Sequence, residues 1–307
     1  MTLEIVQQDG PVVRRYSSTD AVIAIPDPPN APWPVYWYRP PQRLATTTGM
    51  HRFLWDVHYQ PLATGSGAAG LGTVPTQLPI QAIPYNSPTA ATTPWVAPGT
   101  YTVKLTVNGR PYTQPIVVKQ DPRVKTPAPT MQQVYTLTKS MYFGAADAQD
   151  AAMKLSAIRD QLTKLQAQGA TAQAIAAFEK KAAALEGTRA GGRGGRGGGL
   201  EGGGRGRAGR GETPPQAGGQ PAGAGRGATP SAGPVDTLWG LSSLLSGLMN
   251  AMQAADVAPT ANTLAAVTAA QQDAARVMAQ WNALHTVDLP ALNASLRGAG
   301  LAAIDLK

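Results

Sequence analysis

Hydrophobic residues change their spacing once along this 307-residue chain, at Asp121-Pro122-Arg123. Before that point, apolar and polar residues alternate over short segments, which is the period of a β-strand. After it, apolar residues recur every seven positions, as they do in helices that pack along a seam. The proline also stops the last strand, because it cannot donate a ladder hydrogen bond. The sequence therefore predicts a multidomain chain that is first all-β and then all-α.

Residues 1–122 are predicted to form a β-sandwich of the immunoglobulin or fibronectin type, because short alternating segments are separated by turn signals. The strongest of these signals is Asn108-Gly109, between alternating segments at 100–107 and 112–119. A second hairpin is expected around Asp9-Gly10.

Aromatic residues indicate a further strand at Gly49–Asp56. Phe53 and Trp55 are two positions apart, so both are predicted to lie on the inward face of that strand. We also expect a short strand at Leu78–Ile83. The proline-rich run Ile25–Pro34 is expected to be an extended edge or a loop.

Two seven-residue repeats predict a helical hairpin over residues 130–186. One repeat contains Val134, Met141, Ala148, Leu155 and Leu162, and the other contains Leu137, Gly144, Ala151, Ile158 and Leu165. Residues 235–307 are predicted to form a second hairpin, ending in a short helix capped by Asp288 with Pro290 in its first turn. Together the hairpins predict an antiparallel four-helix bundle. The seam lacks the inward Glu and His residues of a di-metal bundle and is therefore assigned to the core.

Residues 187–234 form a Gly/Arg/Pro-rich linker without an aromatic residue, and the composition predicts a disordered insertion between the two hairpins. The segment carries +5 of the net charge of +8, because Glu201 and Glu212 oppose seven arginines. These are Arg189, Arg193, Arg196, Arg205, Arg207, Arg210 and Arg226. RNA binding through them is one hypothesis, but no aromatic residue is present to stack on a base, so a solvated spacer is favoured.

Catalytic and metal-binding patterns are sparse. The chain has no cysteine, no apolar run long enough to span a membrane, and no motif of a nucleotide-binding or hydrolytic site. Asp56 and His58 share a face of the predicted strand, but two ligands without a third make a poor metal site. We therefore expect structural roles for these residues, and neither a cofactor nor catalysis.

Five aromatic residues lie in or beside proline-rich loops: Trp33, Tyr36, Trp37, Tyr38 and Trp95. Such residues provide flat faces on which sugars stack, and they also mark surfaces that bind other proteins. Both interpretations stay open here, and a protein interface is favoured over a glycan site.

Several motifs carry a resemblance to a known family. They are Thr2-Leu3-Glu4-Ile5, Trp37-x-Arg39-Pro40, Gly49-Met50-His51-Arg52-Phe53-x-Trp55-Asp56, Pro98-Gly99-Thr100-Tyr101-x-Val103, Asp121-Pro122-Arg123, Ala255-Asp256-x-x-Pro259-Thr260 and Asp288-Leu289-Pro290-Ala291-Leu292-Asn293. With these, the chain resembles the C-terminal region of large bacterial proteins that carry a sortilin-like, BNR-repeat β-propeller and are often labelled glycosyl hydrolases. The β part also resembles the immunoglobulin-like module of flagellar hook-cap (FlgD-type) proteins.

This resemblance implies an accessory region rather than an enzyme, since any hydrolase function would belong to the propeller. The expected partner is a β-propeller domain of the same or a neighbouring chain, and a homo-oligomer is also possible. The expected location is extracellular or periplasmic, as part of a larger exported protein. The alternatives are a carbohydrate-binding module that presents substrate to a glycoside hydrolase and, third, RNA binding through the linker.

Overall fold

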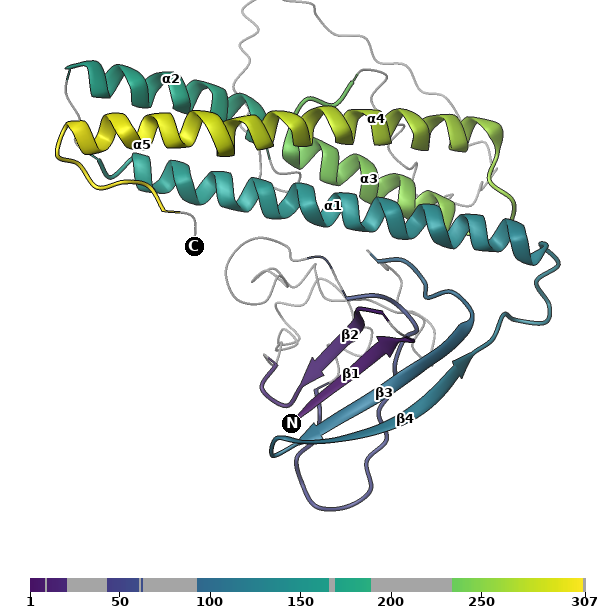
Figure 1. The fold of residues 1–307 in the computed structure, drawn as a ribbon. Coiled ribbons are helices and arrows are strands. Elements are labelled where there is room, and N and C mark those ends of the chain that lie inside the picture. The colour runs from purple at the N-terminus through teal and green to yellow at the C-terminus, as the bar shows by residue number, and fades with distance from the viewer. Residues whose placement is uncertain are drawn as a thin grey trace, which may run out of the picture.

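The computed structural model describes residues 1–8, 10–20, 43–60, 62, 93–165, 169–188 and 234–305. A four-stranded antiparallel sheet lies below a layer of helices (Figure 1). Its strands are β1 (Thr2–Gln7), β2 (Val12–Ser17), β3 (Gly99–Val107) and β4 (Arg110–Val118), in the spatial order β2-β1-β3-β4. The described residues contain this one sheet.

The hairpin between β3 and β4 confirms the prediction made from Asn108-Gly109. Both residues have positive φ, 50° and 80°, as a two-residue turn between antiparallel strands requires. The strands pair from Val107 opposite Arg110 to Gly99 opposite Val118. The hairpin of β1 and β2 is also present, with an irregularity between Ile5 and Val6.

The prediction of a strand at Gly49–Asp56 is wrong. This segment is not a strand and has no ladder partner among the described residues, and positive φ values at Gly49 (132°) and Val57 (54°) interrupt an extended course. Its aromatic side chains hold it instead: the Phe53 ring lies 4.7 Å from that of Tyr16, and the Trp55 ring lies 5.8 Å from that of Tyr101. The two-residue spacing of Phe53 and Trp55 therefore reflects two side chains that pack against the sheet, and not a strand that pairs with another strand. Leu78–Ile83 and Ile25–Pro34 lie outside the described residues.

The helices are α1 (Ala128–Leu162), α2 (Gly169–Glu186), α3 (Leu238–Met252), α4 (Ala261–Ala283) and α5 (Leu289–Gly298), with a π-helical segment η4 (Leu284–Asp288) between α4 and α5. Of these, α1 lies nearest to the sheet (Figure 1). The predicted seam of α1 is buried at Val134, Met141, Ala148, Leu155 and Leu162. Its small residues allow close packing, since a Cβ atom on Gly144 would lie 3.0 Å from Leu245 of α3.

Asp288 does not cap a separate short helix, which corrects the prediction for this residue. It has helical backbone angles, makes no capping hydrogen bond, and instead pairs with Lys181 of α2 at 2.9 Å. The chain continues as helix from α4 through the wider turn of η4 into α5. The wider π-helical turn lets the helix continue past Pro290, because the proline has no N–H to donate to the preceding turn.

The hydrophobic core is continuous from the sheet to the helices. One cluster of buried residues joins Ile5, Val13 and Tyr101 of the sheet to Met141 and Tyr142 of α1 and onward to the other helices. The two layers are therefore held together by burial of apolar side chains as well as by chain connectivity. No helix in the described part of the chain is both long and apolar enough to cross a membrane.

Candidate functional site

Strand β4 is exposed along nearly its whole length. All residues from Arg110 to Val117 are exposed, on both faces of the sheet. Tyr112 and Ile116 lie on one face with 50% and 37% of their area exposed, and Val117 lies on the other with 59% exposed. Apolar side chains on both faces of an uncovered edge strand are typical of a surface that binds another protein.

The free edge of β4 is protected against the addition of another strand. In a hairpin with a two-residue turn, Val107 and Arg110 form a hydrogen-bonded pair, so residues 111, 113, 115 and 117 direct their backbone groups outward. Pro111 and Pro115 occupy two of these four positions and have no N–H to donate. A partner of β4 is therefore expected to bind its side chains and not its backbone.

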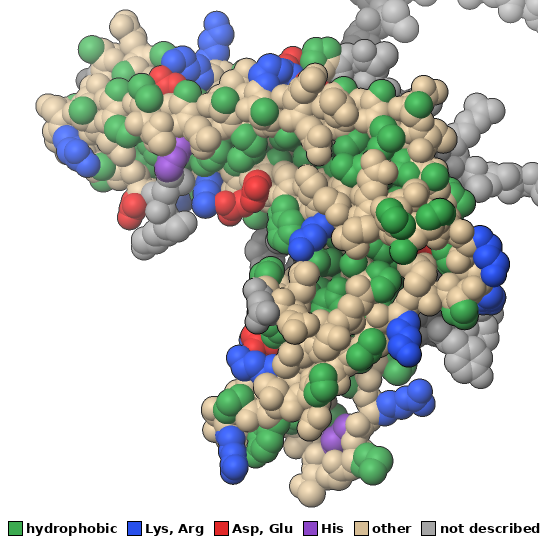
Figure 2. All heavy atoms as spheres, turned by 45° about the vertical axis from the view of Figure 1, so that its right-hand side comes forward, with side chains coloured by type: hydrophobic (Ala, Val, Ile, Leu, Met, Phe, Trp, Pro, Cys, Tyr) green, Lys and Arg blue, Asp and Glu red, His purple; other side chains and the backbone are tan. Residues whose placement is uncertain are grey.

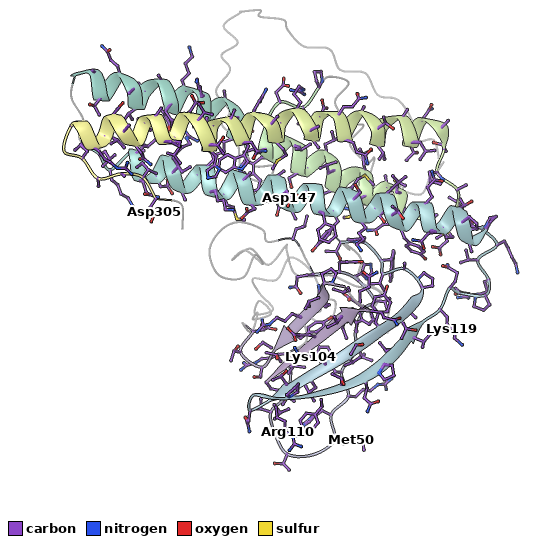
Figure 3. The ribbon with its side chains drawn as sticks, in the orientation of Figure 1. Met50, Lys104, Arg110, Lys119, Asp147 and Asp305 are labelled. Atoms are coloured by element: carbon purple, nitrogen blue, oxygen red, sulfur yellow. The ribbon has the colours of Figure 1, made fainter. Side chains whose placement is uncertain are left out.

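Basic residues mark the two ends of the same strand. Figure 3 places Arg110 at the turn and Lys119 just beyond the other end. The guanidinium of Arg110 lies 5.5 Å from the centre of the Tyr112 ring, while Lys104 of β3 is paired with Glu4 at 3.0 Å. Strand β4 itself contains no acidic residue. We call Arg110, Tyr112, Ile116, Val117 and Lys119 the β4 surface, and Figure 2 shows hydrophobic and basic side chains intermingled over the sheet.

A glutamine side chain joins the sheet layer to the helices. Gln253, directly after α3, donates from Nε2 to the carbonyl of Thr93 at 3.0 Å and accepts from the backbone N–H of Trp95 at 3.2 Å. This amide thus pairs with one C=O and one N–H two residues apart, much as the backbone of a neighbouring strand would do. The contact fixes the end of α3 on the segment that leads into β3.

Helix α1 adds further polar contacts to the sheet layer. Tyr142 donates its hydroxyl hydrogen to the carbonyl of Gln60 at 2.7 Å, and Tyr135 donates to Oε1 of Gln120 at 2.8 Å. Burial raises the pKa of both tyrosines, so both phenols keep the proton that they donate. We call these bonds and the Gln253 contacts the sheet–helix junction.

The Asp56–His58 pair makes local backbone contacts. His58 Nδ1 lies 2.7 Å from the carbonyl oxygen of Asp56, and the Asp56 carboxylate accepts from the His58 backbone N–H at 3.3 Å. Burial lowers the pKa of His58, whose side chain is 1% exposed. Within the described ranges, no group of three or more His, Cys, Asp or Glu residues could hold a metal ion.

Of the five aromatic residues that the sequence suggested as a platform, Trp95 lies in the described part. It is 40% exposed, and its ring centre lies 3.7 Å from that of His58. Trp33, Tyr36, Trp37 and Tyr38 lie outside the described residues, as do Arg189, Arg193, Arg196, Arg205, Arg207, Arg210 and Arg226.

Sequence reasoning overlooked the β4 surface and Gln253. For β4 a signal was available, because prolines at every fourth position in an otherwise strand-like segment mark an edge strand. For Gln253 none was available, since a single glutamine after a helix does not indicate which distant backbone it meets.

No family model, no curated protein and no solved structure matches this chain.

Proposed function

We propose that this chain is a non-catalytic docking module whose β4 surface binds a partner protein. The observation that carries the proposal is the combination found on β4: apolar side chains exposed on both faces and prolines that protect the outer edge. Edge strands in monomeric proteins usually carry charge or are covered. A strand that resists strand addition but keeps Tyr, Ile and Val side chains in solvent suits binding through side chains.

The proposed partner is a β-propeller domain of the same or a neighbouring chain, as the family resemblance implies. Arg110 and Lys119 at the two ends of the strand favour a partner surface with carboxylates at its rim. Nine residues of strand extend over roughly 30 Å, which matches the width of an ordinary protein interface. The chain would then serve as an accessory region of an exported bacterial protein, in the periplasm or outside the cell.

We further propose that the sheet is one layer of an immunoglobulin-like sandwich and that the helices form an antiparallel four-helix bundle. The apolar face of the sheet bears Ile5 and Tyr101. Its burial and the aromatic anchors of Phe53 and Trp55 support a second layer over β1, β2 and β3 on that face, with the side chains of β4 left uncovered. The burial of the small-residue seam of α1 supports the bundle.

Carbohydrate binding and RNA binding are alternatives that no observation on the described residues favours. Trp95 has a structural neighbour in His58 and a backbone bond to Gln253, which accounts for its position. A glycan array and an RNA titration would detect either activity directly.

The test is a calorimetric titration of the full chain with a purified sortilin-like β-propeller domain as the probe. Replacing Tyr112 and Ile116 together by serine is expected to weaken binding at least tenfold, since anchors of this kind contribute more than about 1 kcal/mol each. Val257→Ser is the matched control, because Val257 is 59% exposed in the loop between α3 and α4. Equal affinity of the wild type and the double variant, or an absence of binding, would reject β4 as the docking surface for this partner.

A further inference from the structure

The feature with the most specific chemistry in the described part of the chain is the buried ring of His58. Only 1% of its area is exposed, and it faces Trp95 across an isolated β-bridge, with ring centres 3.7 Å apart. Nδ1 is bound to the carbonyl oxygen of Asp56, which can only accept, so Nδ1 carries the ring hydrogen. Nε2 is therefore the bare nitrogen. It is buried and has no hydrogen-bond partner among the described residues.

Trp95 connects this histidine to the helices. Its backbone N–H donates to Gln253 after α3, at 3.2 Å. Trp95 also lines a small cavity, together with Met131 and Val134 of α1 and Asp256 of the loop between α3 and α4. A path of direct contacts thus runs from His58 through Trp95 to the end of α3.

Protonation of His58 would create a buried positive charge whose new N–H has no hydrogen-bond acceptor among the described residues. The added hydrogen would sit on Nε2, which is shielded from solvent and has no acceptor beside it in the described part of the chain. Arg14 of β2 adds a second positive charge nearby, while Asp56 on the same segment attracts the cation. Across Trp95, on the side of the helices, the titratable groups are Asp256 and Tyr135, which line the small cavity. Burial is the largest influence, and it lowers the pKa of His58.

We propose that His58 is a pH-sensitive latch between the sheet and the helices. In its neutral form the ring supports Trp95 and keeps the Gln253 amide bound to the backbone at Thr93 and Trp95. In acid, protonated His58 leaves its pocket, the support of Trp95 is lost, and the end of α3 separates from the sheet. The device would make the arrangement of the two layers depend on the acidity of the compartment.

The direction of the effect follows from the lowered pKa. The opened form has an ordinary histidine pKa near 6.5, so it binds the proton more tightly than the closed form does. The latch is therefore complete above about pH 6.5 and weakens as the pH falls below this value toward the pKa of the closed form. Within that window the equilibrium constant for opening is expected to rise up to about tenfold per pH unit.

Hydrogen exchange of the full chain at pH 7.5 and 5.5, corrected for the intrinsic rates, tests the proposal. We expect wild-type protection at residues 93–97 and 249–257 to fall several-fold at the lower pH, while α4 stays protected. His58→Phe keeps a flat ring against Trp95 and should abolish the pH effect. His51→Gln and His285→Gln are matched controls, since the chain has three histidines, and both should keep the effect.

Protection that does not change with pH in the wild type, or an unchanged pH effect in His58→Phe, would overturn the proposal. If His58→Phe does not fold, nuclear magnetic resonance titration of the His58 imidazole in the wild type decides. The proposal requires His58 to titrate below the ordinary histidine value near 6.5, and it is rejected if His58 titrates at or above that value.

Discussion

Gly187, directly after α2, and Thr237, the N-cap of α3, are so close that a Cβ atom on Gly187 would lie 2.5 Å from Cβ of Thr237. The chain thus leaves the helical layer at Gly187 and returns to it at the same place. The low-complexity segment between them is therefore inserted at a closed base, formed by Gly187 and Thr237.

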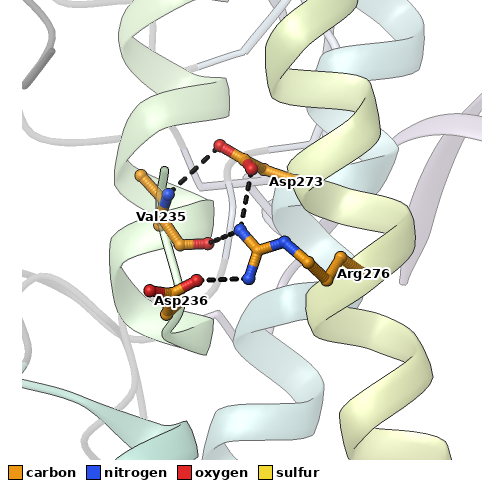
Figure 4. A network of polar contacts seen from close by, with 4 residues as sticks. All are labelled: Val235, Asp236, Asp273 and Arg276. Atoms are coloured by element: carbon orange, nitrogen blue, oxygen red, sulfur yellow. Dashed lines mark hydrogen bonds and ion pairs between the residues drawn. The ribbon is translucent and has the colours of Figure 1, made fainter. Parts of the chain in front are cut away.

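Helix α4 fixes the returning end of this insertion (Figure 4). Nη2 of Arg276 donates to the carbonyl of Val235 at 3.1 Å and to Asp273 at 2.8 Å, and Nη1 is paired with Asp236. Asp273 in turn accepts from the backbone N–H of Val235 at 3.1 Å. The chain is thereby held in place just before the cap of α3.

Gly187→Ala is expected to destabilise the protein by roughly 1–3 kcal/mol, because the residue has a φ of 72° and the new methyl group would collide with Thr237. Gly247→Ala is the matched control within α3, where a Cβ atom meets nothing within 4 Å. That change should stabilise the protein by about 0.5–1 kcal/mol. Urea denaturation measures both, and equal effects would contradict the close contact at Gly187.

Shortening residues 189–233 to about eight Gly and Ser residues should leave the helical content unchanged. The closed base means that a short loop suffices to join the two ends, and the smaller entropy of loop closure favours folding by about 1.5 kcal/mol. Circular dichroism and thermal unfolding test this expectation. A loss of helicity would show that the insertion contributes to the fold, and replacing the segment by Gly and Ser at its full length separates sequence from length.

Asp273 is expected to contribute to stability above about pH 4 and to lose this contribution in acid. Hydrogen bonds from Arg276 and from the Val235 N–H lower its pKa, so the folded protein holds the carboxylate charged where the unfolded chain binds a proton. The contribution is therefore lost as the pH falls through the folded pKa. Asp273→Asn should cost about 1 kcal/mol at pH 7 and reduce the loss of stability between pH 4 and 2. Asp147→Asn, at an exposed position of α1, should keep the wild-type acid sensitivity.

Gln253→Ala is expected to cost about 1–2 kcal/mol, because it leaves the Thr93 carbonyl and the Trp95 N–H without their shared partner. The same exchange at Gln271, exposed on α4, should be neutral or slightly stabilising, since alanine is the better helix former. Urea denaturation compares the two variants. Indistinguishable midpoints would mean that the Gln253 bonds do not hold the layers together.

Local patterns were sufficient to predict the hairpin at Asn108-Gly109 and the buried seam of α1. Both depend on residues that are close together in the chain. The turn depends on residues that tolerate positive φ, and the seam depends on residues that share one face of a helix. The same reasoning misplaced Phe53 and Trp55. Alternation establishes that two side chains share a side, but not that the backbone between them finds a ladder partner.

The sequence by itself determined the order of a β part and a helical part, the turn of the β3–β4 hairpin and the residues that line the helical seam, because these follow from local periodicity. Only the tertiary structure decided that the segment around Phe53 is held by side chains, that Gln253 meets Thr93 and Trp95, and that Gly187 meets Thr237. The physical reason is the same in each case. Such contacts join groups more than thirty residues apart, and which of them form depends on the faces that bury the most apolar area together, a property of the packed layers and not of any single segment.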